Sequence, residues 1–305
     1  MDQNWLRARN NHTYENGRRY HGFKGEFPFP DDREAASAHG TINTIWCHLL
    51  DGKTFVSPIG DSQLQKNHKV LEFATRSGSW AGVVLQQQQP PRLTGMDATH
   101  MSRDTKYFIH HDLEAEWPFT SKQAFHLIHA QSLGGLIADY DGFYARAYRH
   151  LVPGGWLEVW EKDLRFFTES NNEQDEGRLA ALRQWEALME EAAARFGKRI
   201  NVAAEQKDLT QRAGFVEVAE QVFRVPFGKW SDDPRMKNIG GFYKYQMQCA
   251  LEGYTLRLVT KTLGWSKEDT DALLGRVREE LQQEELRLYS NFRLIIGKKP
   301  TESAR

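Results

Sequence analysis

Cysteine is scarce in this chain, and the two that occur stand far apart. Cys47 and Cys249 are about 200 residues apart in a sequence of 305, and neither lies in a CxxC motif or at a spacing typical of metal ligands. A disulfide framework and a thiolate metal site are therefore not indicated, and we expect both residues to be buried thiols.

Long apolar runs and an excess of one charge are also lacking. No apolar segment approaches the roughly 20 residues that a membrane-spanning helix needs, and residues 1–5 lack the basic and then apolar pattern of a signal peptide. The 40 Lys and Arg nearly balance the 41 Asp and Glu, so the net charge of −1 gives no electrostatic case for nucleic acid. The sequence therefore predicts an intracellular, cytoplasmic protein, or a nuclear one if its role is regulatory, with no nucleic-acid or membrane partner.

Strand-like and helical patterns alternate through the middle of the chain. Five apolar runs predict strands at residues 70–73, 92–97, 107–112, 124–130 and 156–161. The last of them follows a helix that is ended by Pro153-Gly154-Gly155. Such alternation is typical of a mostly parallel sheet with right-handed crossovers, and it predicts an α/β fold.

The flanking segments are expected to cover this domain. Residues 1–62 are predicted to form an N-terminal cap, and residues 63–300 the α/β domain, with helical insertions at about 169–208 and 230–290 and a tail at 301–305. Further helices are predicted at 33–50, 176–196, 209–215 and 267–289, and further strands at 216–225 and 291–297. Leu274, Leu281 and Leu288 stand at heptad spacing, which leaves open a homodimer seam or packing on the chain's own core.

Glycine is missing from the turn after the first strand. That strand ends at Glu72, and the turn runs Ala74-Thr75-Arg76-Ser77-Gly78 before a helix begins. A strand, a turn and a helix in this order open nucleotide-binding α/β domains, and the turn uses glycine where φ is positive and where the backbone contacts the ligand. Ala74 and Arg76 occupy two of the three glycine places, so the residues leave cofactor binding open.

The order of these elements resembles that of class I S-adenosylmethionine (SAM) methyltransferases. Six further segments resemble fungal LaeA-like methyltransferases: 15–21 (ENGRRYH), 27–32 (FPFPDD), 152–158 (VPGGWLE), 209–215 (LTQRAGF), 251–253 (LEG) and 263–266 (LGWS). The resemblance runs from about residue 14 to residue 300. It implies a Rossmann-like, seven-stranded sheet whose last strand is antiparallel, and methyl transfer that often serves fungal secondary metabolism. In some members it implies a regulatory role.

The resemblance also assigns cofactor positions. Glu72 matches the acid at the end of the first strand, and the residues at the three glycine places are Ala74, Arg76 and Gly78. Asp97, 19 residues after Gly78, matches the acid that holds the ribose hydroxyls, and the residues matching the pair that contacts adenine are Asp112 and Leu113. Two readings of Arg76 stay open: its side chain blocks the cofactor, or it turns outward or pairs with a carboxylate such as Glu72 or that of the cofactor.

Four residues are candidates for acid–base catalysis. His129 lies near the C-terminal end of the fourth strand, Glu161 follows the fifth, and Tyr20 and His21 belong to the cap that the family folds over its cleft. A plainer role stays open for each, because a lone histidine is commonly packed, acids after strands are commonly solvated, and Tyr20 and His21 can simply hold the cap. The adjacent His110 and His111 point to opposite faces of a strand, so no metal is expected.

Three functions follow from these observations. The first is a LaeA-like, SAM-dependent methyltransferase that acts on a small natural-product intermediate in a cleft between cap and sheet. The second is an enzyme of the same fold that has lost SAM use and guides a cyclisation of the pericyclase type by restricting its substrate's conformation. The third is a regulatory protein that uses the fold to bind another protein, which predicts a closed cleft and an exposed apolar patch.

Overall fold

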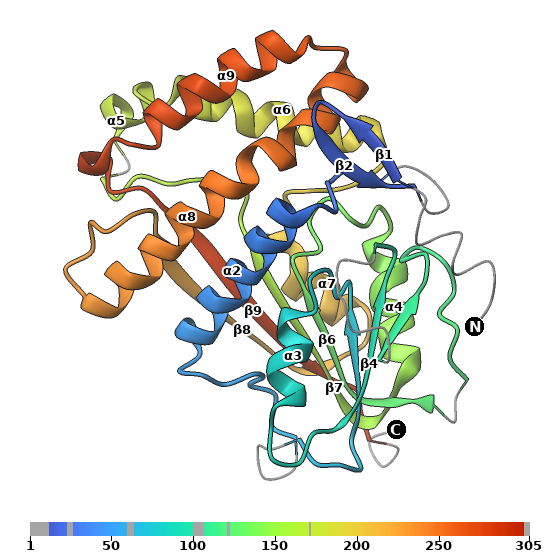
Figure 1. Cartoon of the computed structure of the whole chain (residues 1–305). Helices are drawn as coiled ribbons and strands as arrows, with labels where there is room; N and C mark the ends of the chain where they lie inside the picture. The colour runs from blue at the N-terminus through green and yellow to red at the C-terminus, as the bar shows by residue number, and fades with distance from the viewer. Residues whose placement is uncertain are drawn as a thin grey trace.

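A seven-stranded sheet forms the centre of the described molecule (Figure 1). The computed structural model describes residues 12–22, 27–59, 64–99, 107–120, 123–170 and 172–301. The strand order is β5-β4-β3-β6-β7-β9-β8. The strands are β3 (Lys69–Phe73), β4 (Arg92–Asp97), β5 (Phe108–His110), β6 (Phe125–Gln131), β7 (Leu151–Lys162), β8 (Val216–Pro226) and β9 (Tyr289–Lys298).

The pairing of the last strand confirms the topology that the resemblance implies. Strands β3 to β7 pair in parallel, whereas β9 lies between β7 and β8 and is antiparallel to both. Within this parallel part all carboxyl ends meet at one edge of the sheet, which is where α/β proteins place their ligands.

Helices cover both faces of the sheet (Figure 1). One face carries α2 (Arg33–Leu49), α3 (Ser79–Leu85) and α8 (Pro234–Leu256), and the other carries α4 (Tyr140–His150) and α7 (Gln206–Arg212). A further layer at the top of Figure 1 contains α5 (Glu173–Gly177), α6 (Ala180–Phe196) and α9 (Lys267–Glu280). The Cβ that Gly297 lacks would lie 2.6 Å from Thr210 Cγ2, so glycine lets β9 and α7 approach closely.

Two predicted helices differ from the structure. The helix expected over 176–196 is divided into α5 and α6, and the helix expected over 267–289 ends at Glu280. Past that point Arg287 has a left-handed φ of 45°, a conformation that a right-handed α-helix does not contain. Leu274, Leu281 and Leu288 are buried in the chain's own core, which favours the second reading of the heptad spacing.

The N-terminal hairpin is fastened to the helical layer by a buried arginine. The hairpin consists of β1 (His12–Glu15) and β2 (Arg18–His21). Arg257, from the π-helical turn after α8, donates to Glu15 Oε2 at 2.8 Å and to Thr13 Oγ1 at 2.7 Å. Its guanidinium carbon lies 3.7 Å from the centre of the Tyr20 ring. A buried cation with this many partners is costly to remove, so Arg257 fixes the hairpin on the domain.

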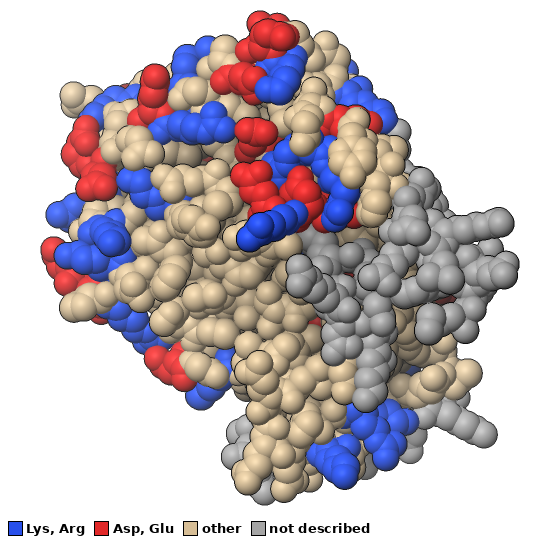
Figure 2. Space-filling view, viewed as in Figure 1, with Lys and Arg blue, Asp and Glu red and all other residues tan. Residues whose placement is uncertain are grey.

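Charges of both signs are mixed on the surface. Figure 2 shows Lys and Arg interleaved with Asp and Glu over the upper part of the visible face. Both cysteines are free and half-buried, so the expectation of buried thiols is only partly met. In the ranges that the structure describes, no helix has the length and apolar character needed to cross a membrane. The predicted boundary at 62/63 and residues 302–305 of the predicted tail lie outside the described residues.

Candidate active site

The turn after β3 keeps the backbone of a glycine turn without the glycines. Ala74, Arg76 and Gly78 have φ values of 57°, 53° and 70°. For a residue other than glycine this left-handed conformation costs about 1–2 kcal/mol. The Oδ2 of Asp97, at the end of β4, accepts a hydrogen bond from the backbone N–H of Arg76, and Oδ1 accepts one from Thr99 N at 2.8 Å. Asp97 therefore holds the turn in its strained form.

The side chain of Arg76 turns inward. It is 4% exposed, and its Nε and Nη2 lie 3.2 and 3.0 Å from Nε2 of His39 on α2. Its guanidinium carbon is 5.1 Å from the ring centre of Phe27 and 6.0 Å from that of Phe29. Among the described residues no Asp or Glu forms an ion pair with it, and Nη1 has no hydrogen-bond partner. The side chain thus neither turns outward nor pairs with Glu72.

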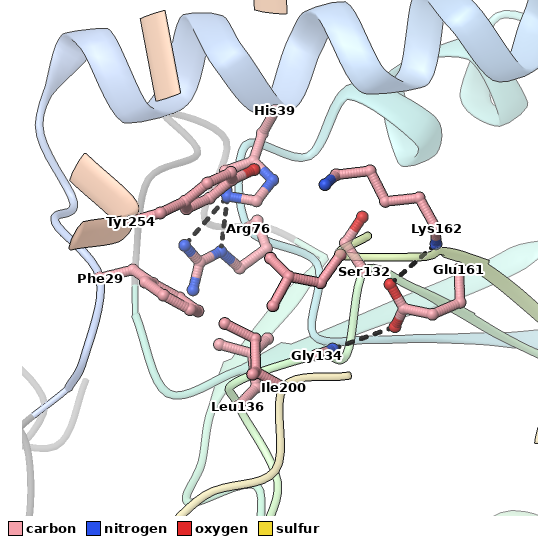
Figure 3. A pocket seen from close by; sticks show the side chains of 11 residues that line it. Phe29, His39, Arg76, Ser132, Gly134, Leu136, Glu161, Lys162, Ile200 and Tyr254 are labelled. Atoms are coloured by element: carbon pink, nitrogen blue, oxygen red, sulfur yellow. Dashed lines mark hydrogen bonds between the residues drawn. The ribbon is translucent and has the colours of Figure 1, made fainter. Parts of the chain in front are cut away.

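A pocket opens beside Arg76, and we call it the Tyr254 pocket. Its volume is about 520 Å³ with the open solvent at its mouth included. The polar groups on its wall are His39, Arg76, Ser132, Glu161 and Lys162, and the apolar ones are Phe29, Leu136, Leu164, Ile200 and Tyr254 (Figure 3). These residues come from α2, α8, the ends of β6 and β7, and the loops next to them. The pocket therefore lies at the carboxyl edge of the sheet, beneath α2 and α8.

Glu161 supplies an acid to this pocket. Its Oε2 accepts hydrogen bonds from Leu133 N at 2.7 Å and Gly134 N at 3.0 Å, and its Oε1 accepts one from Lys162 N at 3.1 Å. Burial raises the pKa of Glu161 to about 7, although these hydrogen bonds favour the ionised form. The carboxyl group can therefore release or take up a proton near neutral pH, as acid–base catalysis requires.

A smaller crevice, the Glu72 crevice, lies on the other side of Arg76. It is about 310 Å³ in volume, and Glu72, Ala74, Ser77 and Gln131 lie on its wall with Arg76. Burial, with a smaller contribution from the charge of Asp97, raises the pKa of Glu72 to about 8. Its Oε2 is buried and has no hydrogen-bond partner among the described residues. Arg76 lines both spaces, as do His39 and Ser132.

His129 lies in the core instead of the pocket. Its ring stacks on that of Trp80 with centres 3.9 Å apart, and its centre is 4.6 Å from that of Trp160 in an edge contact. Neither ring nitrogen has a partner among the described residues, and burial lowers the pKa of His129 to about 3. The predicted role as a base is therefore not supported, because the tryptophans enclose the ring.

The other predicted residues also lie outside the two pockets. Tyr20 packs under Arg257, and burial raises its pKa to about 12, whereas the ring of His21 contacts that of His110 with centres 5.0 Å apart. Asp112 Oδ1 accepts from Glu114 N at 3.0 Å, and Leu113 is buried in the core. The structure thus favours for Tyr20 the plainer role of holding the N-terminal cap on the domain. The segment 100–106, between the ends of β4 and β5, lies outside the described residues.

Three pocket residues were missed by the sequence analysis. His39 stands three residues before Ile42 on the buried side of α2, and a polar residue on an apolar stripe is a signal that could have found it. Tyr254 follows the LEG segment that was singled out, and Lys162 follows Glu161 directly. In the part of the chain that the structure describes, no group of three His, Cys, Asp or Glu residues could hold a metal ion.

Comparison with known proteins decides the family. A family profile described as a methyltransferase domain matches residues 45–220, which is more than half of the chain. The chain belongs to this methyltransferase family. It is 28% identical to methyltransferase pytC of Aspergillus terreus over 95% of this chain and 88% of that protein. It is 25% identical to the secondary metabolism regulator LAE1 of Cochliobolus heterostrophus over 97% of each chain.

Among solved structures, this methyltransferase is similar to Haemonchus contortus phosphoethanolamine N-methyltransferase 2 in complex with SAM. The identity is 16%, the TM-score is 0.45, and the match covers 85% of this chain and 57% of that one.

The residues of the Glu72 crevice fit a cofactor of the SAM type. The orphaned Oε2 of Glu72 can accept from an ammonium group, and the left-handed turn presents its backbone to a ligand as a glycine turn does. Asp97 lies at the end of the neighbouring strand, and its Oδ2 accepts one hydrogen bond and retains a second lone pair. The side chain of Arg76 narrows the space.

Proposed function

We propose that this methyltransferase uses SAM to methylate a small natural-product intermediate of fungal secondary metabolism. The family membership and the names of the relatives support methyl transfer and this setting. The observation that carries the proposal is the retained turn: Ala74 and Arg76 keep a positive φ although neither is glycine, and Asp97 holds them there. A chain that had lost every use for this turn would be expected to relax the strain.

In this proposal the two spaces have different roles. Glu72, on the wall of the Glu72 crevice, and Asp97, which lines neither space and ends the neighbouring strand, would hold the cofactor. Bound SAM would supply an electrophilic sulfonium methyl group. The acceptor lies in the Tyr254 pocket, where apolar side chains exclude water from it. Glu161 takes the acceptor's proton, because its pKa of about 7 makes it a base near neutral pH. The remaining contribution is proximity, since methyl transfer is an in-line displacement.

A second function, an enzyme that does not methylate, is favoured by Arg76. It lines both spaces, and its bulk takes up room in the one in which the cofactor would lie. An enzyme that only restricts and polarises its substrate needs the Tyr254 pocket alone. The open pocket supports either enzyme over the regulatory protein, for which a closed cleft was predicted.

Calorimetry with SAM tests the choice. We expect micromolar binding to the unmodified protein and at least tenfold weaker binding to Asp97→Asn, since about 1.4 kcal/mol separates tenfold affinities. Circular dichroism of the variant checks that it folds. If neither the unmodified protein nor Arg76→Gly binds SAM, methyl transfer is abandoned. If only Arg76→Gly binds it, the non-methylating enzyme becomes the working function.

A further inference from the structure

Arg76 is a buried cation that forms no ion pair with the Asp and Glu residues that the structure describes. Two of its nitrogens face His39, and desolvation by burial, with a smaller contribution from the charge of Arg76, holds the pKa of that imidazole well below its ordinary value. His39 is therefore a neutral acceptor. The Oδ2 of Asp97 accepts from the backbone N–H of Arg76 and not from its guanidinium. Leaving a charge buried and unpaired is costly, so such a group is usually completed by an anion.

The other charged groups of the Tyr254 pocket do not supply that anion. Three backbone N–H groups already occupy the carboxyl oxygens of Glu161. Lys162 adds a second cation: its Nζ lies 5.7 Å from the ring centre of Tyr254. Asp97 and Asp31 act on Arg76 through their charges, and neither accepts a hydrogen bond from its guanidinium: Asp97 accepts from the backbone N–H, and Asp31 Oδ1 accepts from Arg19 Nε at 2.9 Å. The pocket thus presents two cations and one acid that is already hydrogen-bonded.

The free nitrogen of Arg76 faces the apolar wall. In Figure 3 two dashed lines join the guanidinium to His39, and the third nitrogen points away from them, toward Phe29 and Leu136. That nitrogen is Nη1, which has no partner among the described residues. Phe29 and Leu136 line the Tyr254 pocket and not the Glu72 crevice. The donor is therefore directed to the acceptor side of the site.

We propose that Arg76 binds an anionic oxygen group, a carboxylate or an acidic enol, of a substrate whose remaining surface is apolar. The inference rests on the proposed function in taking the Tyr254 pocket as the substrate site. The apolar body packs on Phe29, Leu136 and Ile200, and the anion accepts from Nη1 of Arg76. Arg76 then occupies a glycine place of the turn because it recognises the substrate, and its strained backbone is the consequence of that position.

A matched pair of ligands tests the proposal without SAM. The probes are 4-phenylbutyrate and its amide, which have the same shape and differ in charge. Their dissociation constants are measured by ligand-detected NMR for the unmodified protein, Arg76→Met and Arg76→Lys. We expect the unmodified protein to prefer the carboxylate by about tenfold or more, as a charged hydrogen bond allows. Arg76→Met should bind both within about twofold, and Arg76→Lys should retain part of the preference.

Three results would overturn the proposal. They are equal binding of the two probes to the unmodified protein, binding of neither up to about 10 mM, and an unchanged preference in Arg76→Met. If Arg76→Met does not fold, the Nε–H signal of Arg76 in ¹⁵N-labelled protein, assigned by its absence from Arg76→Lys, replaces the variant. It should shift with the carboxylate and not with the amide, and the opposite result also counts against the proposal.

The calorimetry with SAM and the binding of the ligand pair test separate claims, and either claim can fail alone. A carboxylate preference without SAM binding removes methyl transfer and keeps the anion site. SAM binding without a carboxylate preference keeps methyl transfer and removes the anion site. A thermal unfolding scan distinguishes an arginine that stabilises the fold from one that binds a ligand. If Arg76 stabilises the fold, Arg76→Met should lower the melting temperature. An arginine kept for its ligand should leave the melting temperature unchanged or raised, since a buried unpaired charge is removed.

Discussion

The two spaces at the carboxyl edge of the sheet differ in how well their buried acids are hydrogen-bonded. In the Glu72 crevice the acid lacks a donor: Glu72 Oε2 has no hydrogen-bond partner among the described residues, and the turn beside it keeps a positive φ at Ala74 and Arg76. In the Tyr254 pocket Glu161 is held by three backbone N–H groups within a largely apolar wall. The first space borders a strained turn, whereas the acid of the second space is fully hydrogen-bonded.

Arg76 joins the two regions. Its backbone belongs to the turn that borders the Glu72 crevice, and its guanidinium lines the Tyr254 pocket. The strained backbone therefore borders the Glu72 crevice, whereas the charged side chain that it carries faces the Tyr254 pocket. Strained residues persist where the surrounding structure over-determines them, commonly at functional sites. The comparison therefore places the departure from the family pattern at a residue that lines both spaces.

The largest expected effect concerns the protonation of Glu72. Its pKa is raised from 4.5 to about 8, so between these values the unfolded chain loses a proton that the folded chain keeps. The stability that Glu72 contributes is present below about pH 4.5 and is lost as the pH rises toward 8, by at most about 1.4 kcal/mol per pH unit. Glu72→Gln cannot ionise. Its free energy of unfolding relative to the unmodified protein should rise by as much as about 4 kcal/mol from about pH 5 to about pH 8 in urea titrations.

The neighbouring acid in the same row provides the contrast. Glu158, on β7, is in register with His129, which is in register with Glu72. The carboxyl oxygens of Glu158 accept from Val56 N, Ser57 N and Oγ, and Trp160 Nε1. Burial raises the pKa of Glu158 as well, although these hydrogen bonds favour its ionised form, so its pH dependence has the same sign as that of Glu72. At about pH 5, where Glu72→Gln should be close to the unmodified protein in stability, Glu158→Gln should already be destabilised, because an amide nitrogen cannot accept these bonds. Equal stability of the two variants at that pH would mean that Glu72 is as well hydrogen-bonded as Glu158.

The second prediction tests the hydrogen bonds that Glu161 accepts beside the Tyr254 pocket. Glu161→Ala leaves the N–H groups of Leu133, Gly134 and Lys162 without their acceptor, and should lower the free energy of unfolding by about 3 kcal/mol. Glu161→Gln keeps one acceptor oxygen and should lose about 1 kcal/mol. Urea unfolding of both variants measures the difference. Equal losses would mean that the charge, and not the acceptor, holds the pocket loop.

The third prediction concerns the room for SAM in the Glu72 crevice. Arg76→Gly removes the side chain that narrows it and suits a φ of 53°. SAM affinity should rise by about tenfold, or about 1.4 kcal/mol, in calorimetry. Arg19→Gly, on the cap at a side chain that pairs with Asp31, serves as a matched loss of an arginine and should leave SAM affinity unchanged. An equal gain in both variants would point to a loosened cap instead of a cleared crevice.

Much of the fold was predictable, because its strands are continuous apolar runs bounded by turns. The left-handed turn was predictable too, since the positions of Ala74 and Arg76 in a strand–turn–helix require positive φ. The direction of the Arg76 side chain was not, because it depends on His39 and Phe29, which lie more than 35 residues away in the sequence. His129 was misplaced since β6 is buried on both faces, and such a strand does not reveal which face a residue occupies.

The smallest expected effect isolates the strain of the turn itself. Ala74 has a φ of 57° and is 3% exposed, so Ala74→Gly relieves about 1–2 kcal/mol of left-handed strain. The substitution also loses a buried methyl group, about 0.8 kcal/mol, and increases the freedom of the unfolded chain by about 0.4–1 kcal/mol. The terms nearly cancel, and we expect a change within about 0.5 kcal/mol.

The matched control is Ala192→Gly, in the interior of α6, where the alanine is fully buried and its backbone is right-handed. It loses the same methyl group and about 1 kcal/mol of helix propensity with no strain to relieve, so urea unfolding should show a loss of about 2 kcal/mol. The difference between the two substitutions measures the strain at position 74. If both lose the same amount, the turn is relaxed in solution, and the retained glycine conformation no longer supports a cofactor in the Glu72 crevice.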